Sequence, residues 1–178
     1  DDHSGGAIIS YGQHAIAAHH GPDESRLKSG DSIVMDFGFS YRGYRSDMTR
    51  TVFFQSASTA LEKIYQTVLE AQLAAIQAVR PGVPFHFVDQ VARDIICRAG
   101  YGEYFPHRVG HGIGLDVHEP PYVVGGNEMT LEPGMIFSIE PGIYQPEVGG
   151  VRIEDLILVT EDGFENLNHY TKQLQIIK

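Results

Sequence analysis

Residues 31–54 read DSIVMDFGFSYRGYRSDMTRTVFF and decide the fold that we expect. The β-forming residues at both ends of this stretch predict an antiparallel hairpin. A turn between Tyr41 and Arg42 would place Asp36 directly opposite Asp47, with Cβ atoms about 4.5–5.5 Å apart. Two carboxylates in that position repel each other, and Asp36 has apolar neighbours along the chain. A bound cation would resolve both problems.

A second hairpin repeats this arrangement near the end of the chain. Glu140 and Glu154 each lie in an apolar stretch, and a turn centred at Glu147 would place them opposite each other. A single buried acid is about as often a salt-bridged core residue as a ligand. Four acids in two matched hairpins favour one site between two related halves. Their charge suffices for two divalent ions about 3.5–4 Å apart.

Two helices are predicted between the hairpins. Apolar residues recur every three or four positions over 58–79, where Ser58 can cap the helix. A second helix over 86–99 completes an αα-hairpin, and the order of elements is α+β. The expected strands are 7–10, 31–39, 43–54, 135–141 and 151–160, with 120–133 as a loop and 142–150 joining the last two strands.

Three histidines lie within the stretch 106–119, PHRVGHGIGLDVHE. Its glycines disfavour a helix, and on an extended strand His107 and His111 would face the same side. His118 can point to the same site only if the strand bends. One histidine here would more often be structural, but three within twelve residues favour a site.

The candidate ligands are rich in oxygen. Either His19 or His20, ahead of the first hairpin, could also reach the site. Four carboxylates with at least one imidazole suit Mn²⁺, Co²⁺ or Fe²⁺ better than a cysteine-type zinc site. Two such ions favour hydrolysis of an amide or a phosphate ester. The sequence has no H-E-x-x-H motif, P-loop, G-x-S-x-G elbow or dinucleotide fingerprint.

The composition argues against several other classes of protein. The chain has 178 residues, of which 42% are hydrophobic, and a net charge of −10. These values indicate a globular domain and argue against nucleic acid or an anionic membrane as its partner. The single cysteine, Cys97, excludes a disulfide framework. No apolar run reaches roughly eighteen residues, so we expect no membrane partner and a cytoplasmic location.

Five segments, MDFG, SDMTR, PHRVGHGIGLDVHE, SIEPGIY and VRIED, resemble those of a known family. As a set they are similar to the pita-bread metallopeptidases: methionine aminopeptidase, Xaa-Pro aminopeptidase and Xaa-Pro dipeptidase (prolidase). The set is specific, although GHGIG alone would be moderate evidence, and the resemblance covers essentially the whole chain. It implies an α+β pita-bread (creatinase/aminopeptidase) fold, with two pseudo-related halves around a curved antiparallel sheet.

The resemblance also implies a dinuclear metal centre. Its ligands would be Asp36, Asp47, His111, Glu140 and Glu154. Asp47 and Glu154 would bridge both ions, Asp36 would complete the shell of one ion, and His111 with Glu140 that of the other. Glu140 would also be the catalytic acid that takes the proton from the bridging water.

Four further residues match catalytic positions of the family. His118 matches its substrate- and transition-state-binding histidine. His19 matches an upstream histidine in a P-H-G segment, although here it follows Ala18 and not proline. His107 and Arg152 match positions that the proline-specific members use beside the metals.

The resemblance is closest to the prokaryotic Xaa-Pro branch, because of PHRVGH and the short interval between Glu140 and Glu154. It implies an Xaa-Pro dipeptidase that cleaves the bond preceding proline in small peptides, through a hydroxide bridging two metal ions. Mn or Co are the expected metals, with Zn or Fe as alternatives. The alternative functions are an Xaa-Pro aminopeptidase acting on longer peptides, a methionine aminopeptidase-like enzyme, a metal-free amidinohydrolase of the creatinase type, and an inactive peptide-binding relative or fragment.

The beginning of the chain departs from the family. The catalytic domain of the family usually starts with a further helix pair, and proline-specific members carry another domain before it. Neither is found here, so we expect residues 1–178 to form a single catalytic domain that is truncated at its N-terminus. The full-length form is expected to be a homodimer.

Overall fold

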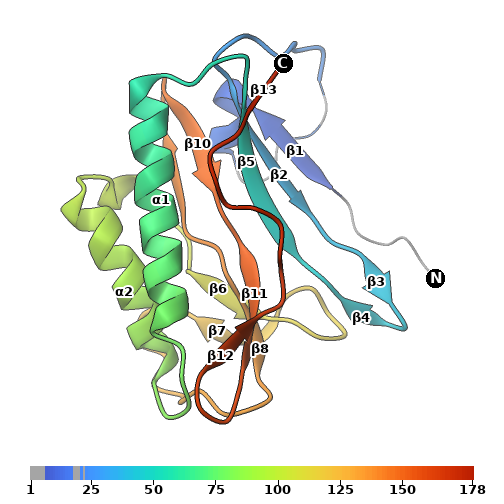
Figure 1. Ribbon diagram of the computed structural model, residues 1–178, viewed down its shortest axis with the longest axis vertical. Coiled ribbons are helices and arrows are strands. Elements are labelled where there is room, and N and C mark those ends of the chain that lie inside the picture. The colour runs from blue at the N-terminus through green and yellow to red at the C-terminus, as the bar shows by residue number, and fades with distance from the viewer. Residues whose placement is uncertain (1–6, 18–20, 22) are drawn as a thin grey trace.

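The computed structural model of the chain describes residues 7–17, 21 and 23–178. Helices α1 (Thr59–Gln77) and α2 (Phe85–Arg98) lie side by side on one face of the strands (Figure 1). They confirm the predicted αα-hairpin. Ser58 caps α1 as expected, because its hydroxyl oxygen accepts a hydrogen bond of 3.2 Å from the Leu61 amide.

The strands form two main sheets and two short hairpins. Their orders are β1-β2-β5-β13 in one sheet and β12-β11-β8-β6-β7 in the other, with β3-β4 and β10-β9 as the hairpins. The bounds are β1 (Ile8–Tyr11), β2 (Ser32–Phe37), β3 (Ser40–Tyr41), β4 (Tyr44–Arg45), β5 (Met48–Phe54), β6 (Gly110–Gly112), β7 (Glu119–Val123), β8 (Ile136–Ile139), β9 (Gly142–Gln145), β10 (Gly149–Arg152), β11 (Asp155–Val159), β12 (Phe164–Asn166) and β13 (Ile176–Ile177). Short 3₁₀ helices cover Gly12–Ile16 and Gly102–Tyr104.

The first hairpin exists, but its predicted register is wrong. Asp36 pairs with Thr49 and not with Asp47. The positive φ angles of Arg42 (52°) and Gly43 (87°) place the turn one residue later than predicted. Asp47 comes two residues before Thr49, so it is a diagonal neighbour of Asp36 on the same face of the sheet.

The predicted register of the second hairpin is confirmed. Arg152 pairs with Gly142 in one ladder, and Asp155 pairs with Ile139 in the next. The same pairing extended between the two ladders places Glu140 opposite Glu154. The predicted connection 142–150 is wrong in part, because β9 and the start of β10 occupy most of it.

The predicted loop 120–133 is also wrong in part, because β7 includes its first residues. Pro120 and Pro121 did not suggest a strand, since proline cannot donate a ladder hydrogen bond. β7 is tolerated because it lies at the edge of its sheet, where one side needs no partner.

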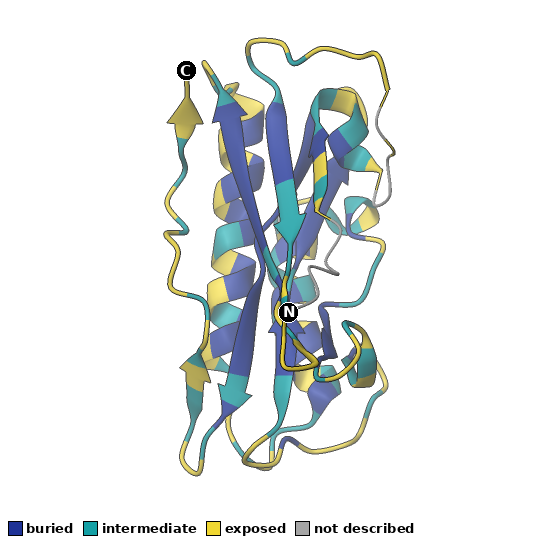
Figure 2. Cartoon of the chain, turned by 90° about the vertical axis from the view of Figure 1, so that its right-hand side faces the viewer, coloured by how far each residue is buried: buried dark blue, intermediate teal, exposed yellow. Residues whose placement is uncertain are grey.

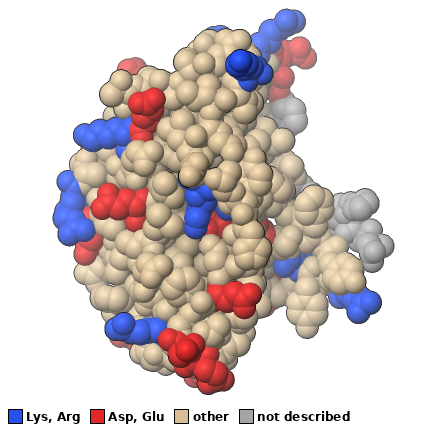
Figure 3. All heavy atoms as spheres, viewed as in Figure 1, with Lys and Arg blue, Asp and Glu red and all other residues tan. Residues whose placement is uncertain are grey.

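The core lies between the helices and the sheets, where Figure 2 shows the buried strands. Phe85 of α2 packs edge-to-face on Phe137 of β8, with ring centroids 5.2 Å apart. Within the described residues, no helix combines the length and apolar character that a membrane span requires. Acidic and basic side chains are interspersed on the face seen in Figure 3.

Candidate metal centre and active site

Four carboxylate side chains and one imidazole approach one another on the sheet face opposite the helices. Asp36 belongs to β2, and Asp47 immediately precedes β5. His111 lies on β6, while Glu140 and Glu154 lie where the second hairpin passes from one ladder to the next. The two hairpins and β6 therefore all contribute to one site.

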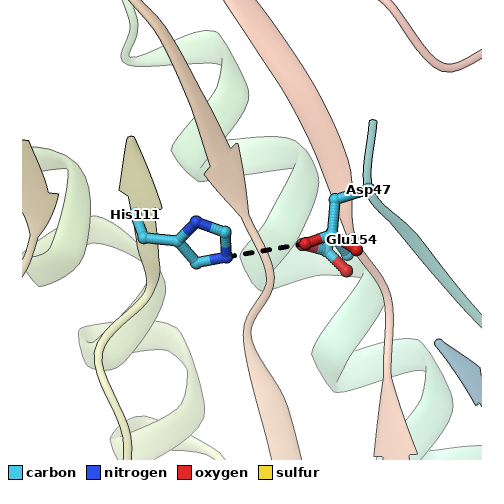
Figure 4. A group of neighbouring side chains, drawn as sticks. All are labelled: Asp47, His111 and Glu154. Carbon is cyan, nitrogen blue, oxygen red and sulfur yellow. Dashed lines mark ion pairs between the residues drawn. The ribbon is translucent and has the colours of Figure 1, made fainter. Parts of the chain in front are cut away.

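Asp47, His111 and Glu154 form the tightest group (Figure 4). One ligand atom from each of these buried side chains lies within 4.8 Å of the others. His111 Nε2 is 3.7 Å from Asp47 Oδ2 and 3.1 Å from Glu140 Oε1. These contacts bring together four of the five predicted ligands, and the fifth, Asp36, lies within hydrogen-bond reach of Asp47.

The orientation of the His111 ring is set by its other nitrogen. Nδ1 lies 3.0 Å from the Gly112 carbonyl oxygen, which can only accept, so Nδ1 carries a proton and donates it. Nε2 then faces the carboxylates. This is the arrangement in which a histidine can give its second nitrogen to a metal ion.

Asp36, the fifth predicted ligand, is paired with a cation of the chain. Its Oδ2 accepts a hydrogen bond from Arg152 Nη2. Asp36 is nevertheless close enough for its charge to act on Asp47. Burial and the charge of Asp36 raise the pKa of Asp47 to about 7.

The buried acids carry more negative charge than their protein neighbours neutralise. Glu154 is 1% exposed, and burial together with the charges of Glu140 and Asp47 raises its pKa well above 4.5. Its Oε2 accepts a 2.7 Å hydrogen bond from the Thr49 hydroxyl. Its Oε1 is buried without a hydrogen-bond partner among the described residues.

These observations fit a divalent metal ion at this site. A buried carboxylate oxygen without a donor is costly, and neighbouring carboxylates increase the cost. A cation held by Asp47, Glu154 and His111 would remove both penalties. Carboxylate oxygens and an imidazole nitrogen also match the donor set that Mn²⁺, Co²⁺ and Fe²⁺ accept.

A chain of hydrogen bonds runs away from Asp36 beside the acids. Arg152 Nη1 donates to the Tyr144 hydroxyl oxygen at 3.0 Å, and that oxygen lies 3.0 Å from His107 Nε2. His107 precedes β6 instead of sharing an extended strand with His111, so their predicted same-side placement on one strand is wrong. Both His107 and Arg152 still approach the acids, through Tyr144 and Asp36.

His118 reaches the site because the chain bends after His111, as its position in the sequence required. The chain is irregular between His111 and Gly112 and then bends before β7. The His118 ring returns edge-on to the His111 ring, with centroids 4.2 Å apart. Burial and the charge of His111 lower the pKa of His118. The third predicted catalytic histidine, His19, and its alternative His20 lie outside the described residues.

Three polar residues at the site were not predicted. Thr49 donates to Glu154, Tyr144 links Arg152 to His107, and the Ser138 hydroxyl donates to Glu140 Oε1 at 3.1 Å. All three lie in the segments SDMTR and SIEPGIY. The spacing offered a signal for Ser138, because it is two residues from Glu140 and faces the same way along a strand.

The comparisons with known proteins agree with this geometry. The sequence profile of metallopeptidase family M24 matches residues 1–161, and the chain belongs to this family. An uncharacterized peptidase of Staphylococcus aureus strain MW2 is 52% identical over 165 residues, which cover 93% of this chain and 47% of that protein.

Solved structures confirm the pita-bread fold. Dipeptidase PepE from Mycobacterium ulcerans aligns with a TM-score of 0.94 and 47% identity, over 98% of this chain and 48% of that chain. Xaa-Pro dipeptidase from Bacillus anthracis aligns with a TM-score of 0.93 and 43% identity, over 96% of this chain and 48% of that one. The chain therefore spans about half the length of the relatives that it matches.

Proposed function

We propose that this chain carries the dinuclear metal centre of an exopeptidase that cleaves the bond before proline in Xaa-Pro dipeptides. The observation that carries the proposal is the buried group of Asp47, Glu154 and His111, in which Glu154 Oε1 lacks a donor. Membership of family M24 gives the class of reaction. The likeness to the Xaa-Pro dipeptidase of Bacillus anthracis supports the choice of proline.

Five side chains are the proposed metal ligands, and two hydroxyl groups orient two of these ligands. Asp36, Asp47, His111, Glu140 and Glu154 would hold two ions. When bound, the ions would supply a water of lowered pKa and polarise the scissile carbonyl. Thr49 and Ser138 orient the carboxylates of Glu154 and Glu140 through their hydroxyl groups. These fixed orientations reduce the rearrangement that metal binding requires.

The remaining residues act on the substrate and the proton. Glu140 would accept the proton of the attacking water and return it to the leaving nitrogen. His118, whose lowered pKa favours the neutral ring, would donate a hydrogen bond to the carbonyl oxygen as negative charge develops there. Arg152, His107 and Tyr144 would hold Asp36 in place and line the same side of the site.

The proposal includes properties of the longer protein. We propose Mn²⁺ or Co²⁺ as the native ions, a homodimer, and action in the cytoplasm. Xaa-Pro aminopeptidase activity on longer peptides is the second candidate, because it would use the same ligands and the same proline preference.

The deciding experiment combines metal content with peptide hydrolysis. An Xaa-Pro dipeptide, the matching Xaa-Ala dipeptide and an Xaa-Pro-Xaa tripeptide are incubated with the chain, with and without Mn²⁺. Metal-dependent cleavage of the Xaa-Pro dipeptide alone is the expected result. Cleavage of the tripeptide would favour the aminopeptidase, whereas equal cleavage of the Xaa-Ala peptide would exclude proline specificity. No cleavage with two ions bound would contradict the proposed activity of this chain.

A further inference from the structure

A second buried polar cluster lies directly behind the metal centre, on the helix side of the sheet. Its middle is Asp155, which is fully buried. Arg50 Nη2 donates to Asp155 Oδ1 at 2.6 Å, and Lys172 Nζ donates to Oδ2 at 2.6 Å. Gln72 of α1 and Asn166 of β12 donate to the same Oδ2 at 3.1 and 2.8 Å. Asp155 therefore accepts hydrogen bonds from three separate parts of the chain: β5, α1 and the segment 166–172.

The members of this cluster are chain neighbours of residues in the metal centre. Asp155 follows Glu154, and Arg50 follows Thr49, whose hydroxyl holds Glu154. Arg50 Nη1 also donates to the backbone carbonyls of Thr49 and Glu154, at 2.8 and 2.6 Å. The Glu154 backbone is thus tied to β5 by a guanidinium group on the opposite face of the sheet.

The C-terminal segment 166–172 closes the cluster. Arg50 donates to the carbonyls of Tyr170 and Thr171 in this segment, at 2.9 and 3.1 Å. Asn168 donates its amide to the backbone carbonyl of Asp47 at 3.3 Å and accepts from the Leu156 amide. The segment therefore contacts the backbone carbonyl of Asp47, one proposed ligand. It also contacts the backbone amide of Leu156, two residues after Glu154, another proposed ligand.

We propose that segment 166–172, acting through Asp155 and Arg50, positions the carboxylates of Asp47 and Glu154 and so sets the metal affinity of the centre. The inference rests on the metal centre proposed above. Asp155, Arg50 and residues 166–172 are not among the proposed metal ligands or substrate-binding residues, so they would act as positioning residues. Groups that orient metal ligands in this way typically change metal affinity by about 10–100-fold when removed.

Lys172→Met is the variant that tests the proposal. The substitution keeps the length of the side chain and removes the ammonium group from Asp155 and Gln72. Loss of a nearby positive charge should, by Coulomb attraction alone, tighten the binding of a cation. A positioning role predicts the opposite, an affinity for Mn²⁺ weaker by about tenfold or more.

The measurement is the affinity for Mn²⁺ alone, from the electron paramagnetic resonance signal of free Mn²⁺ during titration. Circular dichroism checks that each variant is folded at the temperature used. Lys172→Arg retains charge and donors and should bind Mn²⁺ nearly as the unaltered chain does. Gln72→Met, which removes another donor from Asp155 without a change of charge, should also weaken binding.

Ile96→Val is the matched control for a general loss of stability. Ile96 is a fully buried core residue of α2, outside the polar cluster. The Ile96→Val substitution should lower the midpoint of thermal unfolding and leave Mn²⁺ affinity unchanged. Unchanged or tighter Mn²⁺ binding by folded Lys172→Met and Gln72→Met would overturn the inference. An equal loss of affinity in Ile96→Val would do the same. Failure of the unaltered chain to bind Mn²⁺ would instead overturn the proposed metal centre.

Discussion

Asp47 shows how far a single side chain decides the chemistry of this site. It belongs to the tight three-residue group, and burial with the charge of Asp36 raises its pKa to about 7. An acid that is held in such surroundings without a cation costs stability. The metal ion proposed for this site would account for the placement of Asp47, which packing alone does not explain.

Asp47→Ala should abolish binding of two metal ions and with it peptidase activity, because a proposed bridging ligand is lost. Metal content after gel filtration, measured by mass spectrometry, checks this. Asp94→Ala, which removes an exposed acid from α2, is the control and should keep both ions. Two bound ions and normal turnover in Asp47→Ala would show that the centre lies elsewhere.

His118→Ala should lower kcat by about 10²-fold or more while metal remains bound, because the ring would act on the substrate and not as a ligand. Steady-state hydrolysis of the Xaa-Pro dipeptide gives kcat, and the metal content is measured on the same sample. An unchanged kcat would remove His118 from the catalytic residues.

All five proposed ligands could be predicted from the resemblance to the family. The expected positions of the two turns alone predicted four of them, as two pairs of acids on opposite strands. The predicted cross-strand pairing is right for Glu140 and Glu154 and wrong for Asp36 and Asp47. The predicted pairing depends on the position of the turn, and Arg42 adopts a positive φ that its residue type did not suggest. Tyr144 could not be recognised, since its role depends on a contact with His107 that no local spacing encodes.

Among the elements, the helices were the most predictable because their apolar periodicity and end signals agreed. Ser58→Ala should lower the free energy of unfolding by about 1 kcal/mol, because the Leu61 amide at the start of α1 loses its acceptor. Urea unfolding in the presence of EDTA measures this without a contribution from metal. Ser58→Asp retains an acceptor and should remain close to the unaltered chain; an equal loss in both variants would contradict a capping role.

The strands were less predictable because several of them are defined by partners and not by their own sequence. β7 contains two prolines and is a strand only because β6 lies beside it. The glycines of the second hairpin suggested a loop, yet Gly150 lies in β10, where a Cβ atom would come within 2.1 Å of the Ala15 carbonyl oxygen. Glycine is needed there for a close approach that the sequence alone does not reveal.

For the whole molecule, the buried Asp155 predicts a loss of stability in acid. Burial raises its pKa, but the hydrogen bond from Lys172 and the charge of Arg50 outweigh burial and lower it below 3.8. A lowered folded-state pKa gives stability that is present above the unfolded value and lost as the pH falls through the folded value. The loss should therefore occur below about pH 4.

Urea unfolding at pH 5 and pH 3, with EDTA present, measures this loss. Lys172→Met removes the largest of the effects that lower the pKa of Asp155, so its stability should fall less between the two pH values than that of the unaltered chain. An identical fall in both proteins would show that Asp155 does not contribute.

The hydrogen bond between Thr49 and Glu154 joins residues that are 105 positions apart in the chain. A ribosome adds about 5–20 residues per second, so roughly 5–20 s of synthesis separate the two halves of the acidic group. Until the second hairpin emerges, the nascent chain presents the first two acids without Glu140, Glu154 or Arg152. Metal loading of the proposed centre would therefore have to follow translation of both hairpins, and the free metal ions in the cell at that moment would decide which ion is captured.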